Sequence, residues 1–178
     1  MPTPVVMVSS LTRKSAQVTL DALELGAIDY VAKPHSNIYD GKDEIKDELI
    51  QKVIHASYAK VQKHVAQKSL VLNKTSIAET TKKVIAIGSS TGGTEALKVV
   101  LQRFPKNSPA IVIVQHMPDT FIGSFATRLN ELCEIDVKVA QNGDFLEMGT
   151  AYIARGGLHM VLRRSGAKYY VELGEGHR

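Results

Sequence analysis

A serine in a glycine-rich turn is the residue best suited to chemistry in this sequence. Ser90 lies at the centre of a Gly-x-Ser-x-Gly pattern that follows an apolar run and opens a helical one. In a nucleophile elbow, such a turn lifts the serine hydroxyl clear of a β-sheet. We expect Gly88 and Gly92 to be required on either side, because a Cβ atom there would clash in so tight a reversal. Ser90 is therefore the first candidate nucleophile.

A serine hydroxyl is a weak nucleophile unless a neighbouring group accepts its proton, and His116 is the candidate base. It comes directly after the apolar run Ile111–Val114 and Gln115, much as Ser90 comes after the run Val84–Ile87. If these runs are neighbouring parallel strands, both side chains project from the same carboxyl edge. The N-terminus of the next helix would then face a tetrahedral oxyanion, with the Thr91 N–H as candidate donor.

Two other interpretations of these residues stay open. A glycine-rich strand-to-helix turn also binds phosphate groups, although no Gly-x-x-x-x-Gly-Lys-Ser/Thr pattern occurs here. A histidine that ends a buried strand is often structural. The polar-flanked histidines and the single cysteine show no metal-ligand spacing; they are His35, His55, His64, His177 and Cys133.

Composition limits the class of protein. The 178 residues are 44% hydrophobic and carry a formal charge of +4 that is spread along the chain, so no clustered basic stripe indicates nucleic-acid binding. No apolar run approaches the roughly 20 residues of a membrane span, and no signal peptide is evident. One cysteine excludes an internal disulfide and favours a small buried side chain. We therefore expect a cytoplasmic protein without membrane insertion.

The elements that position the chemistry fall into unlike blocks. The first, residues 1–34, predicts a strand over Pro4–Ser10, a helix over Ser15–Gly26 and a strand over Ala27–Ala32. Such a β-α-β unit implies parallel strands, and it is too small to fold alone. The second block, 35–82, predicts an amphipathic helix over Asp43–Lys63 and then a polar linker over Ala66–Thr81.

The third block, residues 83–178, predicts alternating strands and helices. Helices are expected over Gly92–Phe104 and Asp119–Leu132, and strands over Val84–Ile87, Ala110–Val114, Val137–Ala140, Ala151–Ala154, Met160–Arg163 and Tyr169–Leu173. The first two strands are continuous apolar runs, which is typical of strands covered by helices on both faces. The fold class is therefore α/β with a doubly wound parallel sheet.

Several strings in the third block resemble the effector domain of the chemotaxis protein-glutamate methylesterases. They are Ile85–Ala96, Gln115–Pro118, Ser124–Ala126 with Arg128–Asn130, and Ala151–Ala154 with His159-Met160. Those enzymes are response regulators, and two strings in the first block, Val6–Thr12 and Ala22–Pro34, resemble the end of their receiver domain.

The resemblance implies a receiver remnant over 1–34, a helical linker over 35–82 and the first part of a methylesterase domain over 83–178. It implies hydrolysis of glutamate γ-methyl esters, and deamidation of glutamine, on methyl-accepting chemotaxis receptors. Ser90 would be the nucleophile and His116 the base, with no metal or cofactor. The resemblance also implies that a histidine kinase of the chemotaxis system is a partner of the full-length proteins of this family. In the receiver part, Ser9 matches the switch hydroxyl, Tyr30 the aromatic switch position and Lys33 the phosphoryl-contacting lysine, before Pro34.

The sequence also departs from the family pattern. The phosphorylated aspartate and the acidic pair of the receiver have no match in this sequence. The aspartate of the catalytic triad has none either, because Asp119, Asp136 and Asp144 do not lie in the glycine-rich segment that surrounds it in the family. Arg155 replaces the proline that usually follows Tyr-Ile-Ala. The expectation is a truncated, incomplete domain whose activity is near background, because loss of the acid costs about four orders of magnitude in the triad template. The alternative is a non-catalytic receptor-binding fragment.

Overall fold

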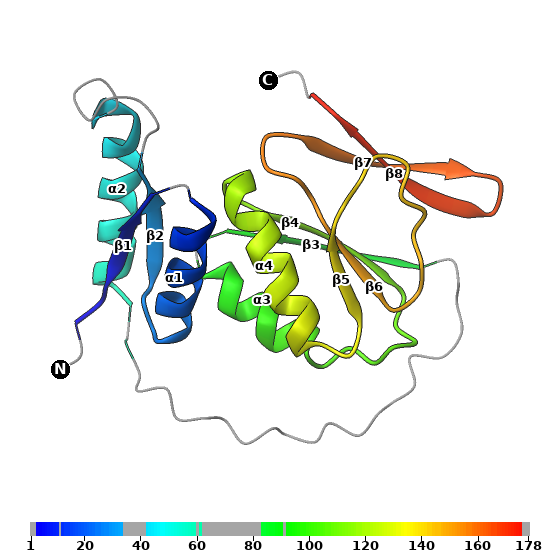
Figure 1. Cartoon of the computed structure of the whole chain (residues 1–178), viewed down its shortest axis with the longest axis horizontal. Coiled ribbons are helices and arrows are strands. Elements are labelled where there is room, and N and C mark those ends of the chain that lie inside the picture. The colour runs from blue at the N-terminus through cyan, green and yellow to red at the C-terminus, as the bar shows by residue number, and fades with distance from the viewer. Residues whose placement is uncertain are drawn as a thin grey trace. The chain divides into compact units, whose positions relative to one another are not determined.

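The structure, a computed structural model, describes residues 3–10, 12–33, 42–59, 61, 83–90 and 92–175. The chain divides into two compact units, Met1–Val71 and Leu72–Arg178, which are considered separately. Figure 1 shows the elements of each unit along the chain.

The first unit contains the predicted β-α-β motif. Strand β1 (Val6–Ser9) pairs in parallel with β2 (Asp29–Ala32), and α1 (Arg13–Glu24) connects them. The helix begins earlier than predicted because the Thr12 hydroxyl caps it, accepting a 3.2 Å hydrogen bond from the Ser15 N–H. After the helix, Gly26 adopts a φ of +106°, as expected of a glycine that ends a helix.

Helix α2 (Lys42–Ser57) contacts both β2 and β1 and so adds to this unit the cover that the β-α-β motif alone lacks. It ends six residues before the predicted Lys63, and a backbone bond of 3.2 Å from the Tyr58 N–H to the His55 carbonyl closes its last turn. The predicted linker over Ala66–Thr81 lies outside the described residues.

The second unit is built on a four-stranded parallel sheet. Its strands follow the order β3-β4-β6-β5, with bounds Val84–Ser89, Ala110–Gln115, Thr150–Ile153 and Asp136–Val139 respectively. Helix α3 (Gly93–Leu101) connects β3 to β4, and α4 (Asp119–Leu132) connects β4 to β5. An antiparallel hairpin of β7 (His159–Ser165) and β8 (Lys168–Gly174) follows. The α/β class and the predicted elements of this unit are confirmed, with bounds shifted by at most three residues.

Different elements cover the two faces of this sheet. Side chains alternate along a strand, and Ala110, Val112 and Tyr152 form one core cluster with Val171 of the β8 strand. Ile111 and Ile113 point to the opposite face and are fully buried. Helices α3 and α4 contact each other and lie side by side in Figure 1, and each buries an apolar stripe. Within the described residues, the hairpin therefore takes the place of the helices expected on the second face.

Strand β3 differs from the fully buried strand that its apolar run predicts. Four of its six residues are half-buried and two are exposed, whereas β4 is buried at five of its six residues. The cause is its position in the described sheet, where β4 pairs on both sides and β3 on one. Composition alone does not separate an edge strand from a central one.

Two further observations complete the fold. Cys133, expected to be a small buried side chain, is half-buried at the end of α4, and burial raises the pKa of its thiol. No helix among the described residues combines the length and the apolar character that a membrane crossing requires.

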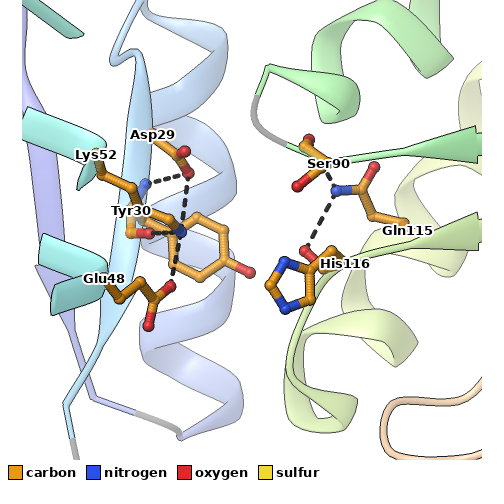
Figure 2. A network of polar contacts seen from close by, with 7 residues as sticks. All are labelled: Asp29, Tyr30, Glu48, Lys52, Ser90, Gln115 and His116. Carbon is orange, nitrogen blue, oxygen red and sulfur yellow. Dashed lines mark hydrogen bonds and ion pairs between the residues drawn. The ribbon is translucent and has the colours of Figure 1, made fainter. Parts of the chain in front are cut away.

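Lys52 of α2 is bound to β2 by several polar contacts (Figure 2). Its Nζ lies 3.3 Å from Asp29 Oδ1 and 2.9 Å from Glu48 Oε1, and it donates a 2.6 Å hydrogen bond to the Tyr30 carbonyl. The same ammonium lies 5.0 Å from the centre of the Tyr30 ring. Asp29 is 5% exposed, and its buried Oδ2 accepts no hydrogen bond from the described residues. Lys52 is therefore the main compensation for a buried carboxylate.

We predict that Lys52→Met lowers the free energy of unfolding of the first unit by about 3 kcal/mol, because it leaves the Asp29 carboxylate buried without its cationic partner. Amide hydrogen exchange of β2 measures this change locally within the full chain. Lys46→Met, at an exposed position of the same helix, is the matched control, expected within about 0.5 kcal/mol of the parent. Equal protection of β2 in the two variants would contradict the assignment.

Candidate active site

The pairing of β3 with β4 brings Ser90 and His116 to one edge of the sheet. The strands run parallel in a register that places Ser89 opposite Gln115, and Ser90 and His116 follow those two residues. The backbone N–H of His116 donates a 3.0 Å hydrogen bond to the Ser89 carbonyl, which continues the pairing past β4. Both side chains are exposed. The expectation of neighbouring parallel strands is confirmed.

The described residues show no hydrogen bond between the Ser90 hydroxyl and the His116 ring, and Figure 2 shows the imidazole turned away from the serine. Catalytic hydrogen bonds are often long or misaligned until substrate binds, and both side chains lie at exposed positions where rotation is unhindered by burial. The roles of nucleophile and base therefore stay predictions, supported by the common edge.

Gln115, which sequence reasoning missed as a functional candidate, connects the two strands at this edge. Its Oε1 accepts a hydrogen bond from the Ser89 hydroxyl, and its Nε2 donates to the carbonyls of Ser90 at 3.0 Å and His116 at 3.4 Å. The side chain is almost completely buried, with the residue 7% exposed. The sequence signal for a role of Gln115 was its position directly before His116. Its hydrogen-bond partners could not be predicted, because they depend on the register between β3 and β4.

Glycine is required in this turn at Gly92 and Gly93, for reasons that differ from those predicted. A Cβ atom on Gly88 or on Gly92 would meet nothing within 4 Å, so the expected clash is wrong for both. Gly92 has a φ of +71°, in the left-handed region, and acts as the N-cap of α3. Gly93 is the glycine of this turn that has no room for a side chain. A Cβ atom there would lie 2.8 Å from Ser89 Cβ and 2.5 Å from Gln115 Oε1.

The candidate oxyanion donor, Thr91, lies outside the described residues. The residues on either side of Thr91 are described. Among them, the Gly93 N–H donates a 2.8 Å hydrogen bond to the Ser90 carbonyl. Helix α3 begins at Gly93, so the chain after Ser90 does lead directly into a helix N-terminus, as predicted.

Arg155, at the position where the family pattern has proline, forms an ion pair with Asp119. Its Nη2 lies 3.1 Å from Asp119 Oδ2, and the Gly156 N–H donates to Asp119 Oδ1 at 3.2 Å. These contacts attach the segment after β6 to the first residue of α4. Asp144 lies 2.9 Å from Lys138. Asp119 and Asp144 thus each have a cationic partner of their own.

The structure also brings together two of the switch candidates of the first unit. Ser9 ends β1 and Lys33 follows β2, and the Lys33 N–H donates a 2.7 Å hydrogen bond to the Ser9 carbonyl. The Ser9 hydroxyl accepts a 2.8 Å hydrogen bond from Thr19 Oγ1. Tyr30 lies within β2 instead, where burial first, and then the carboxylates of Asp29 and Glu48, raise the pKa of its hydroxyl well above the usual range. Pro34 lies outside the described residues.

A parallel α/β sheet with a serine turn and a histidine at one carboxyl edge has the architecture of a serine hydrolase. The CheB methylesterase family matches residues 85–178 of the sequence. The chain belongs to this family.

Individual relatives agree with that assignment. The chain is 56% identical over 185 residues to a protein-glutamate methylesterase/protein-glutamine glutaminase of Sulfurimonas denitrificans, a match that covers 99% of this chain and 53% of that protein. It is 50% identical to a second such protein from Syntrophus aciditrophicus, over 97% of this chain and 51% of the relative. The chain therefore spans about half the length of the curated relatives it matches.

A solved structure is also similar. The crystal structure of the Thermotoga maritima CheB methylesterase catalytic domain superposes with a TM-score of 0.53 at 39% sequence identity. The superposition covers 56% of this chain and 53% of that domain.

We predict that Gly93→Ala destabilises the second unit by about 2 kcal/mol, because the added methyl group overpacks the contact between Ser89 and Gln115. The change in free energy of unfolding is measured by urea unfolding of the full chain, with amide hydrogen exchange in β3 and β4 as the local probe. Gly123→Ala in α4 is the matched control, since its Cβ would meet open space and the substitution gains about 0.5 to 1 kcal/mol of helix stability. Equal stability of the two variants would refute the packing argument.

Proposed function

We propose that the chain carries the nucleophile and the base of a protein-glutamate methylesterase that also deamidates protein glutamine. The proposal is supported by its family and by the shared edge that holds Ser90 and His116. The substrates would be glutamate γ-methyl esters and glutamines on methyl-accepting chemotaxis receptors. The observation that carries the proposal is the parallel register of β3 and β4, since it places an alcohol and an imidazole on adjacent strand ends.

The proposed reaction is acyl transfer through serine. Ser90 Oγ attacks the ester carbonyl carbon while an imidazole nitrogen of His116 accepts the hydroxyl proton. The tetrahedral oxyanion, stabilised by the Thr91 N–H, collapses and expels methoxide, which takes the proton from His116 and leaves as methanol. Water, deprotonated by the same imidazole, then attacks the acyl carbon; Ser90 Oγ leaves and takes the proton back from the imidazolium, and the glutamic acid formed ionises to the carboxylate. With glutamine as substrate, ammonia leaves in place of methanol.

We also propose the domain assignment that the resemblance implies: a receiver remnant over 1–34, a linker over 35–82 and the first part of a methylesterase domain over 83–178. The closeness of Ser9 to Lys33 at the ends of parallel strands supports a receiver switch. We amend this assignment in one respect: because α2 contacts β2 and β1, we count that helix with the receiver part and not with the linker. A cytoplasmic location and a chemotaxis histidine kinase as partner follow from the same assignment.

The proposal predicts that Ser90 of this chain reacts covalently with a serine-directed fluorophosphonate. We expect Ser90→Ala to abolish labelling, because the attacking oxygen is lost. His116→Gln should slow labelling by about 100-fold or more, the range of general-base catalysis. The measurement is the second-order rate constant of labelling, with the modified residue located by peptide mass spectrometry. Release of methanol from methylated receptor cytoplasmic domains, measured on the same variants, tests the substrate class.

Matched controls separate chemistry from folding. Ser165→Ala and His159→Gln change an exposed serine and an exposed histidine of the hairpin and should label at the parental rate. Equal labelling of Ser90→Ala and the parent would overturn the nucleophile assignment. Saturable nucleotide binding by a chain that resists the fluorophosphonate would favour a phosphate-binding turn. Receptor binding that survives Ser90→Ala without any methanol release from the parent would favour a non-catalytic binding fragment.

A further inference from the structure

The Gln115 amide lies at the point where both strands of the site end, and it contacts both candidate chemical residues through their backbone (Figure 2). It is 7% exposed, and a buried amide is costly unless its polar atoms are hydrogen-bonded. The Oε1 accepts from the Ser89 hydroxyl, and Nε2 donates to the carbonyls of Ser90 and His116. All three contacts are to residues on the carboxyl edge of the sheet.

The surroundings determine which end of the amide faces the nucleophile. Two backbone carbonyl oxygens face one end of the side chain, at 3.0 and 3.4 Å, and carbonyls only accept hydrogen bonds. That end must therefore be the NH₂ group. The other end accepts from the Ser89 hydroxyl, which can donate. Gly93 leaves the space for this end, since a Cβ there would lie 2.5 Å from Oε1.

The Ser90 carbonyl is held by two donors. The last strand pair is Ser89 with Gln115, and beyond it the His116 N–H bonds the Ser89 carbonyl, which belongs to the peptide unit that precedes Ser90. The Ser90 carbonyl oxygen accepts from the Gly93 N–H at 2.8 Å, within the turn, and from Gln115 Nε2 at 3.0 Å, across from β4. The Gln115 contact is the side-chain hydrogen bond that ties the Ser90 carbonyl to the strand that bears His116, in addition to the backbone bond from the His116 N–H to the Ser89 carbonyl.

We propose that Gln115 is a positioning residue for Ser90: its amide fixes the backbone of the nucleophile against the strand end that carries the base. This inference rests on the proposed function and adds a residue to it. The amide touches no reacting atom. It sets the direction from which the Ser90 side chain leaves the backbone, and small errors in that direction reduce rates steeply, by about 100-fold for 1 Å.

The test uses two substitutions of similar length in the full chain. Gln115→Met fills the same space without hydrogen bonds and should lower the fluorophosphonate labelling rate of Ser90 by about 10- to 100-fold. Gln115→Glu keeps an acceptor for Ser89 but, when ionised, has no donor for the Ser90 carbonyl. Protonation restores one donor, so the labelling rate of Gln115→Glu relative to the parent should rise as the pH falls from 8 to 5. The relative rate of Gln115→Met should stay constant over that range.

The pH-dependent ratio is the readout that a purely structural role would not give. Gln141→Met, at an exposed position, is the control for the loss of an amide and should label at the parental rate. Circular dichroism and urea midpoints show whether each variant is folded; should Gln115→Met not fold, the pH series of Gln115→Glu decides alone. Parental rates in both Gln115 variants, or a Gln115→Glu ratio independent of pH, would overturn the inference. A parent chain unreactive at Ser90 would instead refute the proposed function, so the two failures are distinguishable.

Discussion

The parallel pairing of β3 with β4 is the constraint on which the site depends. Parallel strands end at the same edge, and a register that sets Ser89 opposite Gln115 places the next residue of each strand side by side. A shift of one residue would turn each side chain to the other face of the sheet. Ile111 and Ile113 resist such a shift because they are fully buried between the sheet and its helices. The apolar core therefore fixes the position of polar residues that lie outside it.

Both units supplement strand pairing with a polar side chain that donates to a backbone carbonyl, half-buried in the first unit and buried in the second. In the first unit, Lys52 donates to the Tyr30 carbonyl and neutralises Asp29. In the second, the Gln115 amide donates to the Ser90 carbonyl just beyond the last strand pair. Burying such groups costs free energy unless they are fully paired, so they add little net stability. What they provide is a single backbone arrangement, because any other one leaves a buried charge or amide without partners.

The sequence predicts those features that depend on local pattern. The elements of both units follow from apolar runs, and the edge shared by Ser90 and His116 follows from their place after two such runs. Features set by contacts between residues far apart in the sequence cannot be predicted from local pattern. The edge position of β3 depends on which strands pair, and the importance of Gly93 depends on Gln115, 22 positions away in the sequence and adjacent in space. The clash expected at Gly88 and Gly92 was wrong for the same reason: the crowded side of the turn is the one that faces β4.

The division between exposed and buried residues at this edge bears on the kind of substrate that the proposed enzyme would accept. Ser90 and His116 are exposed, whereas Gln115 and Gly93, which support them, are buried. A small ligand is normally bound in a concave site that buries most of its surface. Ser90 and His116, exposed but supported by buried neighbours, suit a reacting group that is part of a large partner. The partner's own surface then supplies the binding energy and excludes water. A glutamyl ester on a receptor protein is such a group.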